Sequence, residues 1–171
     1  GLRPEQRTLD QAKALARQLW PDVEAADDYK ELELDDDRAR AFRWQAWLAI
    51  AGLWDLEDPS SVDVVSTEQK VTADLGSVPF LGIIDRVDRI DGKLVVSDYK
   101  SGTLPSVRFR DDKIQQVMLY AAALDAMGDE QPERARRIYL GQRILDVTVT
   151  DRRLEEAVSQ ISETWTAINQ A

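Results

Sequence analysis

The chain has 171 residues, of which 43% are apolar and 32% are charged, so it is long enough for one globular domain with its own core. It contains neither cysteine nor histidine, which excludes disulfides, zinc–thiolate sites, iron–sulfur clusters and hydrolases that use a histidine base. The net charge of -10 argues against general nucleic-acid binding, and with no membrane-length apolar run and no signal peptide we expect a cytoplasmic protein.

The first predicted helix begins near Thr8, which forms a capping-box pattern with Gln11. Pro21 is expected to end this helix, because proline lacks a backbone donor and its ring clashes with the preceding turn. The acidic stretch 22–37 is then predicted to be a loop or a frayed connection. The apolar stripe of the helix consists of Ala12, Leu15, Ala16 and Leu19.

A second helix is expected after Asp35 or Asp36, either of which can cap it, and Pro59 marks its exit. Its predicted buried side consists of Ala39, Phe42, Ala46, Ile50 and Leu53. Tryptophans either bury a partner surface or fill a core, and we expect the core for all five of them. They are Trp20, Trp44, Trp47, Trp54 and Trp165.

The chain then changes to the two-residue period of strands. Strands are predicted over 62–75, 78–90 and 93–100. The turn between the last two is Asp91-Gly92, the strongest hairpin signal in the sequence.

After a loop, Asp111 or Asp112 is expected to cap a helix that ends at Gly128. The inward positions of that helix are Ile114, Val117, Met118, Ala121 and Leu124. A hairpin over 134–140 and 144–150 and a last helix follow. The apolar face of the last helix consists of Leu154, Val158, Ile161, Trp165 and Ile168. This order predicts the α/β class, with a central mixed sheet flanked by helices. We expect a single domain over 1–171, with a helical N-terminal part over 1–60 and a core over 61–171.

Two acids and a lysine stand out on the central hairpin. Asp98 and Lys100 are two residues apart, so they project from one face of their strand. Asp85 precedes the Asp91-Gly92 turn by the same number of residues by which Asp98 follows it, so the hairpin sets the two acids nearly opposite each other. Two close carboxylates repel each other unless a cation lies between them, and oxygen ligands favour Mg²⁺ or Mn²⁺. The hairpin therefore predicts a site for a divalent cation.

Each of these features alone has an ordinary structural explanation. A single aspartate at a strand end often caps a turn, and an Asp–Lys pair is often a surface salt bridge. The three residues together, opposed across one hairpin, favour the site. Nearby, Arg108, Arg110 and Lys113 either grip phosphates or belong to a solvated loop. Residues 85–113 carry six acids and seven bases, a net charge of +1, whereas residues 1–60 carry fourteen acids and eight bases, a net charge of -6.

Three motifs in this region resemble those of the RecB branch of the PD-(D/E)XK nucleases, including RecB-like exonucleases of the actinobacterial type. These are a Gly-x-x-Asp-Arg-x-Asp strand at 82–88, an Asp-Tyr-Lys-x-Gly strand at 98–102 and a Gln-x-x-x-Tyr helix at 116–120. Each motif is weakly specific, but the ordered set is strong, and the resemblance covers roughly residues 60–171. It implies a restriction-endonuclease-like core and metal-dependent hydrolysis of DNA, as single strands or duplex ends, in repair or recombination with a helicase or another repair protein.

The resemblance also implies roles for individual residues. Asp85 and Asp98 match the metal-binding acids, and Lys100 matches the lysine that orients the attacking water and stabilises charge on the phosphate. Gln116 and Tyr120 match the helix motif that supports the site and contacts the strand being cut, although Tyr120 also suits a core position and Gln116 a solvated helix face. Glu68 is either a third acid near the metal or a structural partner of a basic residue. Arg86 and Asp88 are interpreted as a structural ion pair on the opposite strand face.

The sequence departs from the family pattern at its beginning. RecB-family nucleases usually carry a histidine-bearing helix there, so we expect that this segment and one metal ligand are missing from the chain. Two alternatives to a nuclease remain: a catalytically inactive DNA-binding or scaffolding module, and a metal-dependent phosphoesterase that acts on small nucleotides. Metal binding tests the first, and competition between single-stranded DNA and mononucleotides tests the second.

Overall fold

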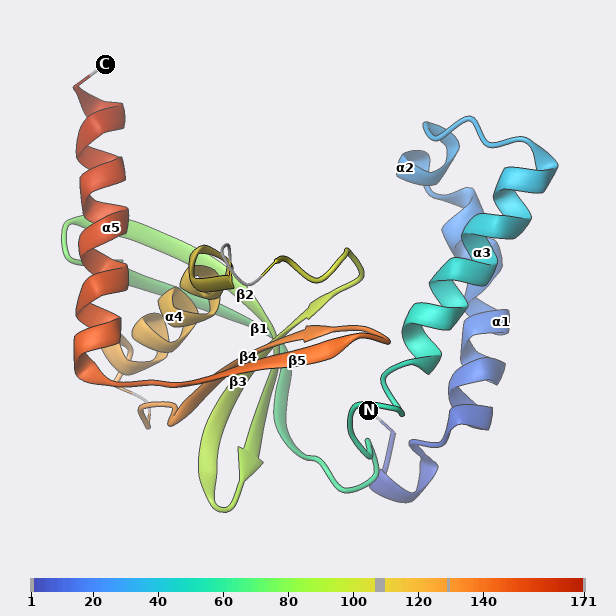
Figure 1. Ribbon diagram of the computed structural model, residues 1–171, viewed down its shortest axis with the longest axis horizontal. Helices are drawn as coiled ribbons and strands as arrows, with labels where there is room; N and C mark the ends of the chain where they lie inside the picture. Colours follow the sequence, from blue (N-terminus) through green and yellow to red (C-terminus); the bar gives the residue numbers. More distant parts are fainter. Residues whose placement is uncertain (1, 107–109, 129, 171) are drawn as a thin grey trace. The chain divides into compact units, whose positions relative to one another are not determined.

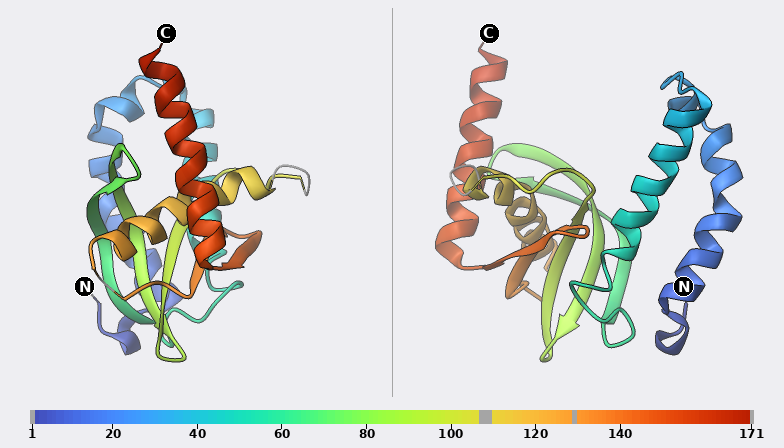
Figure 2. Two further views of the ribbon diagram at one scale, coloured as in Figure 1. Left: turned by 90° about the vertical axis from the view of Figure 1, so that its left-hand side faces the viewer. Right: turned by 45° about the vertical axis from the view of Figure 1, so that its right-hand side comes forward.

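The computed structural model describes residues 2–106, 110–128 and 130–170, and the side chains of residues 110–113 are not described. The chain divides into two compact units (Figures 1 and 2). The helical unit comprises Gly1–Val62 with Leu140–Gln142, and the sheet unit comprises Asp63–Tyr139 with Arg143–Ala171. None of the helices in the described part of the chain has the length and apolar character needed to cross a membrane.

Two helices of the helical unit begin at predicted caps. It contains the 3-10 helix η1 (Pro4–Gln6) and the helices α1 (Leu9–Ala25), α2 (Asp27–Lys30) and α3 (Asp36–Ala51). The Thr8 hydroxyl accepts a hydrogen bond from the backbone N of Gln11 at 3.2 Å. The carboxylate of Asp35 accepts one from the backbone N of Arg38 at 2.8 Å. Each cap satisfies one of the donors that a helix leaves free in its first turn.

Pro21 does not end the first helix, contrary to the prediction. Helix α1 continues through it to Ala25, so part of the stretch predicted as a loop is helical. A proline inside a helix costs about 3 kcal/mol, and tertiary packing beside it offsets that cost. Trp20, the preceding residue, is buried, and its ring lies 6.0 Å from that of Tyr29 and 6.3 Å from that of Phe42. These rings join α1, α2 and α3.

The predicted buried side of α3 is largely exposed. Helix α3 has no buried residue, and Phe42 and Ile50 are 42% and 40% exposed. The core prediction is also wrong for Trp44 and Trp165, which are 57% and 37% exposed. Helical periodicity identifies which residues share a face, but it carries no information on what covers that face.

The sheet unit confirms the predicted α/β class with a mixed sheet flanked by helices. Its strands are β1 (Asp63–Leu75), β2 (Val78–Ile90), β3 (Lys93–Lys100), β4 (Arg134–Tyr139) and β5 (Arg143–Thr148). They lie in the order β1-β2-β3-β4-β5, with all pairs antiparallel except the parallel pair β3–β4. The predicted turn joins β2 to β3, and Asp91 and Gly92 both have positive φ, at 51° and 78°, as the preferred hairpin turn requires.

Helix α4 (Arg110–Ala126) connects the two parallel strands and packs on the sheet, and α5 (Asp151–Asn169) packs against α4 (Figure 1). The inward positions predicted for α4 are confirmed at Val117, Met118, Ala121 and Leu124, which are at most 4% exposed. They pack in one core with apolar residues of β1, β2 and β3, among them Val71, Ile84 and Val96.

The burial pattern of β2 changes at Asp85. Before it, burial alternates: Gly82 and Ile84 are buried, whereas Leu81 and Ile83 are 62% and 50% exposed. The face that leads to Asp85 is therefore open to solvent, although its residues Leu81 and Ile83 are apolar. After Asp85, consecutive residues are buried on both faces. Asp85, itself half-buried, thus lies where the strand passes from an open face into the interior.

Candidate active site

Asp85 and Asp98 lie where the pairing of β2 with β3 ends. The last paired residues are Arg86 and Ser97, so the two acids are the next residues along the two strands. Residues that face each other across such a pair project from the same side of the sheet. Asp85 Oδ2 also accepts a hydrogen bond from the backbone N of Tyr99 at 2.7 Å. This bond ties the carboxylate of β2 to the backbone of β3 immediately after Asp98.

Asp98 is held between two cationic side chains. Lys100 Nζ lies 2.8 Å from Asp98 Oδ2 and 2.9 Å from Oδ1, and Arg137 Nε lies 3.4 Å from Oδ2. The second contact follows from the parallel register, which places Asp98 beside Arg137 of β4. Asp98 is 2% exposed, so the Asp98–Lys100 pair is not an ordinary surface salt bridge. A buried carboxylate needs such compensation, because leaving water costs several kcal/mol per ion.

The donor chemistry of this cluster fits a hard divalent cation. Asp98 Oδ2 is buried and accepts no hydrogen bond from the described residues, although both cations lie within ion-pair distance. Within residues 2–106, 110–128 and 130–170, no group of three or more histidine, cysteine or carboxylate side chains could hold a metal ion. Two carboxylates still suffice for Mg²⁺, which keeps several waters and binds through one or two acids together with substrate phosphates.

Glu68 lies on β1 between residues that pair with the two neighbours of Asp85. Thr67 pairs with Arg86 and Gln69 pairs with Ile84, so the register position opposite Asp85 belongs to Glu68. Glu68 is exposed and has a φ of 51°, which is unusual for a residue with a side chain in a strand. Among the described residues, no basic side chain forms an ion pair with it. Both interpretations of Glu68, as a third acid near the metal or as a structural ion-pair partner, therefore stay predictions.

The helix motif is anchored on the strand that carries Asp85. Tyr120 is 7% exposed, and Gln116 Nε2 donates a hydrogen bond to its hydroxyl at 2.8 Å. The ring of Phe80 meets the Tyr120 ring edge-on, with the centroids 6.3 Å apart. A Cβ at Gly82 would lie 2.7 Å from Tyr120 Cε1, which is too close. Tyr120, the tyrosine of the third motif, therefore occupies the space that a side chain would need at Gly82, the glycine of the first motif.

Replacing Gly82 with alanine is expected to lower the free energy of unfolding by about 1–3 kcal/mol, because the new methyl group must displace the buried Tyr120 ring. Urea denaturation measures the change. Gly102→Ala is the matched control, because a Cβ at Gly102 meets nothing within 4 Å. Equal stability of the two variants would show that Tyr120 can move aside without cost.

The opposite side of the same strands carries a structural network. Arg86 Nε lies 2.8 Å from Asp88 Oδ1, and both side chains are buried, so the predicted structural ion pair is confirmed. Ser97 Oγ donates a hydrogen bond to Asp88 Oδ2 at 3.4 Å, and Arg86 also donates one to the hydroxyl of Tyr99. This network fixes the strand ends that carry Asp85 and Asp98 without contributing to their side of the sheet.

The remaining predicted phosphate contacts lie outside the described part of the chain. Arg108 is among the residues that the structure does not describe, and Arg110 and Lys113 belong to α4 without described side chains. Their proposed role stays a prediction.

Sequence reasoning missed Arg137, the second cation beside Asp98. One signal was available, because three of the six residues of β4 are arginines: Arg134, Arg136 and Arg137. Arginine is rarely buried without a partner, so a strand this basic indicates acids nearby. The pattern alone could not identify Asp98 as that acid.

Comparison with known proteins agrees with this arrangement. A family model described as the PD-(D/E)XK nuclease superfamily matches residues 1–171, which is the whole chain. No match was found among curated proteins. The family match includes the helical unit as well as the strands and the helix that carry the three motifs. The chain therefore belongs to the PD-(D/E)XK nuclease superfamily.

Proposed function

We propose that this protein is a deoxyribonuclease that hydrolyses phosphodiester bonds with the help of Mg²⁺ or Mn²⁺. Membership of a nuclease superfamily supports hydrolysis of nucleic acid, and nucleases of this superfamily typically use divalent metal ions. The observation that carries the proposal is the buried Asp98 carboxylate, held between Lys100 and Arg137 and next to a second acid, Asp85, tied to the same strand.

Asp85 and Asp98 are the residues that would hold the metal ion. When bound, the ion activates water and neutralises charge on the phosphate. Lys100 contributes differently, because its side chain is 30% exposed and is oriented by Asp98. A fixed ammonium at this place orients the attacking water and stabilises the negative charge that builds up on the phosphate. Arg137 and the Tyr99 backbone keep the two acids in position.

We place the protein in the RecB-like branch, as an exonuclease of DNA repair or recombination that acts on single strands or duplex ends, together with a helicase or another repair protein. Gln116 is exposed, which suits contact with the strand being cut, whereas the buried Tyr120 supports the site by packing. In this proposal Glu68 is a third acid beside the metal ion, and Arg108, Arg110 and Lys113 bind phosphates. Salt should then weaken DNA binding steeply.

Calorimetric titration with Mn²⁺ tests the proposal directly. We expect the wild-type chain to bind Mn²⁺ and to degrade DNA in its presence, with both properties lost in Asp85→Asn and Asp98→Asn, because each variant removes one anionic ligand. Asp74→Asn is the matched control, because Asp74 is an exposed acid of β1.

The alternative of an inactive DNA-binding or scaffolding module predicts another result. In that case the wild-type chain neither binds Mn²⁺ nor cleaves DNA, and the Asp98→Asn variant behaves like it. Cleavage that persists in excess chelator would equally contradict the proposal.

A further inference from the structure

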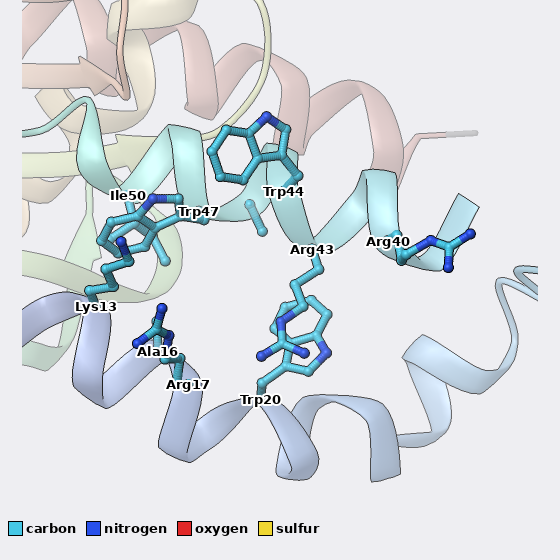
Figure 3. Close-up of a pocket in the computed structure, with 10 residues that line it drawn as sticks. Lys13, Ala16, Arg17, Trp20, Arg40, Arg43, Trp44, Trp47 and Ile50 are labelled. Carbon is cyan, nitrogen blue, oxygen red and sulfur yellow. The ribbon is translucent and has the colours of Figure 1, made fainter. Parts of the chain in front are cut away.

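A groove of about 260 Å³ lies between α1 and α3 of the helical unit (Figure 3). Its lining includes four cationic side chains and no carboxylate: Lys13 and Arg17 come from α1, and Arg40 and Arg43 come from α3. Residues 1–60 contain fourteen acids and only eight bases. Half of those bases therefore gather at the groove, and none of the acids lines it. This recess is thus cationic although the unit as a whole is acidic.

Three of these cations are not neutralised by acids. Arg40 forms an ion pair with Asp37, but within the described part of the chain no carboxylate lies within 4 Å of Lys13, Arg17 or Arg43. Two of the three, Lys13 and Arg43, contact aromatic rings instead. The Arg43 guanidinium lies 5.2 Å from the centre of the Trp20 ring. Such contacts orient a cation and leave its charge available to an anion.

Two more tryptophans line the groove, Trp44 and Trp47, and both belong to α3. Lys13 Nζ lies 6.0 Å from the centre of the Trp47 ring, and Figure 3 shows the Lys13 side chain extending from α1 toward it. Trp44 is 57% exposed, the largest exposed fraction of any tryptophan in the chain. An indole ring that is left in water and lines a positively charged recess can serve as a stacking platform for a base.

We propose that this groove binds a single-stranded segment of nucleic acid, separately from the site on the sheet unit. Lys13, Arg17 and Arg43 contact the phosphates, and bases stack on Trp44. Cationic grooves with aromatic platforms bind single strands in this way, because every base offers a π-face and every nucleotide a negative charge. An apolar protein partner would instead bury three cations without a counter-charge, at a cost of several kcal/mol per ion. The inference rests on the proposed function only in taking DNA as the strand.

Fluorescence anisotropy with a labelled oligothymidylate of about 12 nucleotides tests the proposal, in excess chelator so that no cleavage occurs. We expect Trp44→Ala to weaken binding about tenfold, since it removes one stacked base. Arg17→Glu should weaken binding by a similar factor and reduce its dependence on salt concentration. Both side chains are exposed, so neither variant should disturb folding, which circular dichroism verifies.

Two control variants match these changes. Trp165→Ala removes an exposed tryptophan of α5, and Arg38→Glu makes the same charge change as Arg17→Glu at an exposed residue of α3 that does not line the groove. Both are expected to bind the oligonucleotide as the wild-type protein does. Equal affinities for all variants, or no binding by the wild-type protein, would overturn the proposal. So would sedimentation that shows self-association lost in Trp44→Ala with unchanged oligonucleotide affinity, because the groove would then be a protein interface.

The outcome is separable from that of the proposed nuclease. If the wild-type protein cleaves DNA but the groove variants bind the oligonucleotide unchanged, only the groove proposal fails. If cleavage is absent while Trp44→Ala and Arg17→Glu bind weakly, the groove proposal is supported and only the nuclease proposal fails.

Discussion

Replacing Lys100 with alanine is expected to reduce the rate of DNA cleavage by about 100-fold to 1000-fold, the usual effect of removing one fixed group that stabilises transition-state charge. The protein should remain folded, because the Lys100 side chain is partly exposed and Asp98 keeps its contact with Arg137. The loss should appear in kcat more than in KM, since the ammonium acts on charge that is largest in the transition state. Affinity for Mn²⁺ should stay the same or rise, because a competing cation has been removed from Asp98.

The measurement is single-turnover cleavage of end-labelled DNA with saturating Mn²⁺. Lys93→Ala is the matched control, because Lys93 is an exposed lysine at the other end of the same strand. It should cleave like the wild-type protein. If Lys100→Ala also cleaves at the wild-type rate, Lys100 has no chemical role and its contact with Asp98 is only structural.

The central hairpin was predictable because its information is local. The bounds of β2 and β3 agree with the prediction, and the Asp91-Gly92 turn alone sets their register. That register places Asp85 next to Asp98 without any knowledge of the rest of the fold. The alternation of side chains along β3 likewise brings Asp98 and Lys100 together. In the structure, Lys100 Nζ lies 2.8 Å from Asp98 Oδ2.

The failures lie in the helical unit, where burial depends on elements far away in the sequence. Helix α1 continues past Pro21, where the ring of Trp20 contacts the rings of Tyr29 in α2 and Phe42 in α3. The helix-breaking tendency of proline takes no account of such contacts, so it predicts the wrong end of the helix. Periodicity indicates which residues of α3 share a face but not what covers that face, so it predicts buried positions for Phe42 and Ile50, which are exposed. From the sequence pattern alone, these exposed apolar residues cannot be distinguished from residues of a buried core.

The contacts of the candidate site also divide into those between residues close in sequence, which could be predicted, and those between distant residues, which could not. Contacts within the hairpin were accessible from sequence, whereas Arg137 reaches Asp98 only through the parallel pairing of β4 with β3 after the helical crossover. The packing of Tyr120 on Gly82 also joins residues distant in sequence. The motif order suggested that these residues belong together, but their contact depends on how α4 lies on the sheet.

The contact between Arg137 and Asp98 has a measurable consequence for stability. Arg137→Met is expected to lower the free energy of unfolding by about 3 kcal/mol, because it leaves a buried carboxylate with a single, partly exposed cation. The comparable change Arg134→Met should cost no more than about 1 kcal/mol, since the Arg134–Asp146 pair is more exposed, at 42% and 25% of the two side chains. Urea denaturation with a common m value compares the two variants.

A double-mutant cycle separates the ion pair from the other contacts of Arg137. The Arg137 guanidinium also lies 5.8 Å from the centre of the Tyr139 ring. Arg137→Met removes this contact whether residue 98 is aspartate or asparagine. With Asp98→Asn no charged acid remains unpaired, so Arg137→Met should then cost about 1–3 kcal/mol less than in the wild-type protein. An equal cost in both backgrounds would assign the stabilisation to packing on Tyr139. A cost that shrinks with Asp98→Asn identifies Arg137 as a positioning residue that holds the buried Asp98 side chain in place.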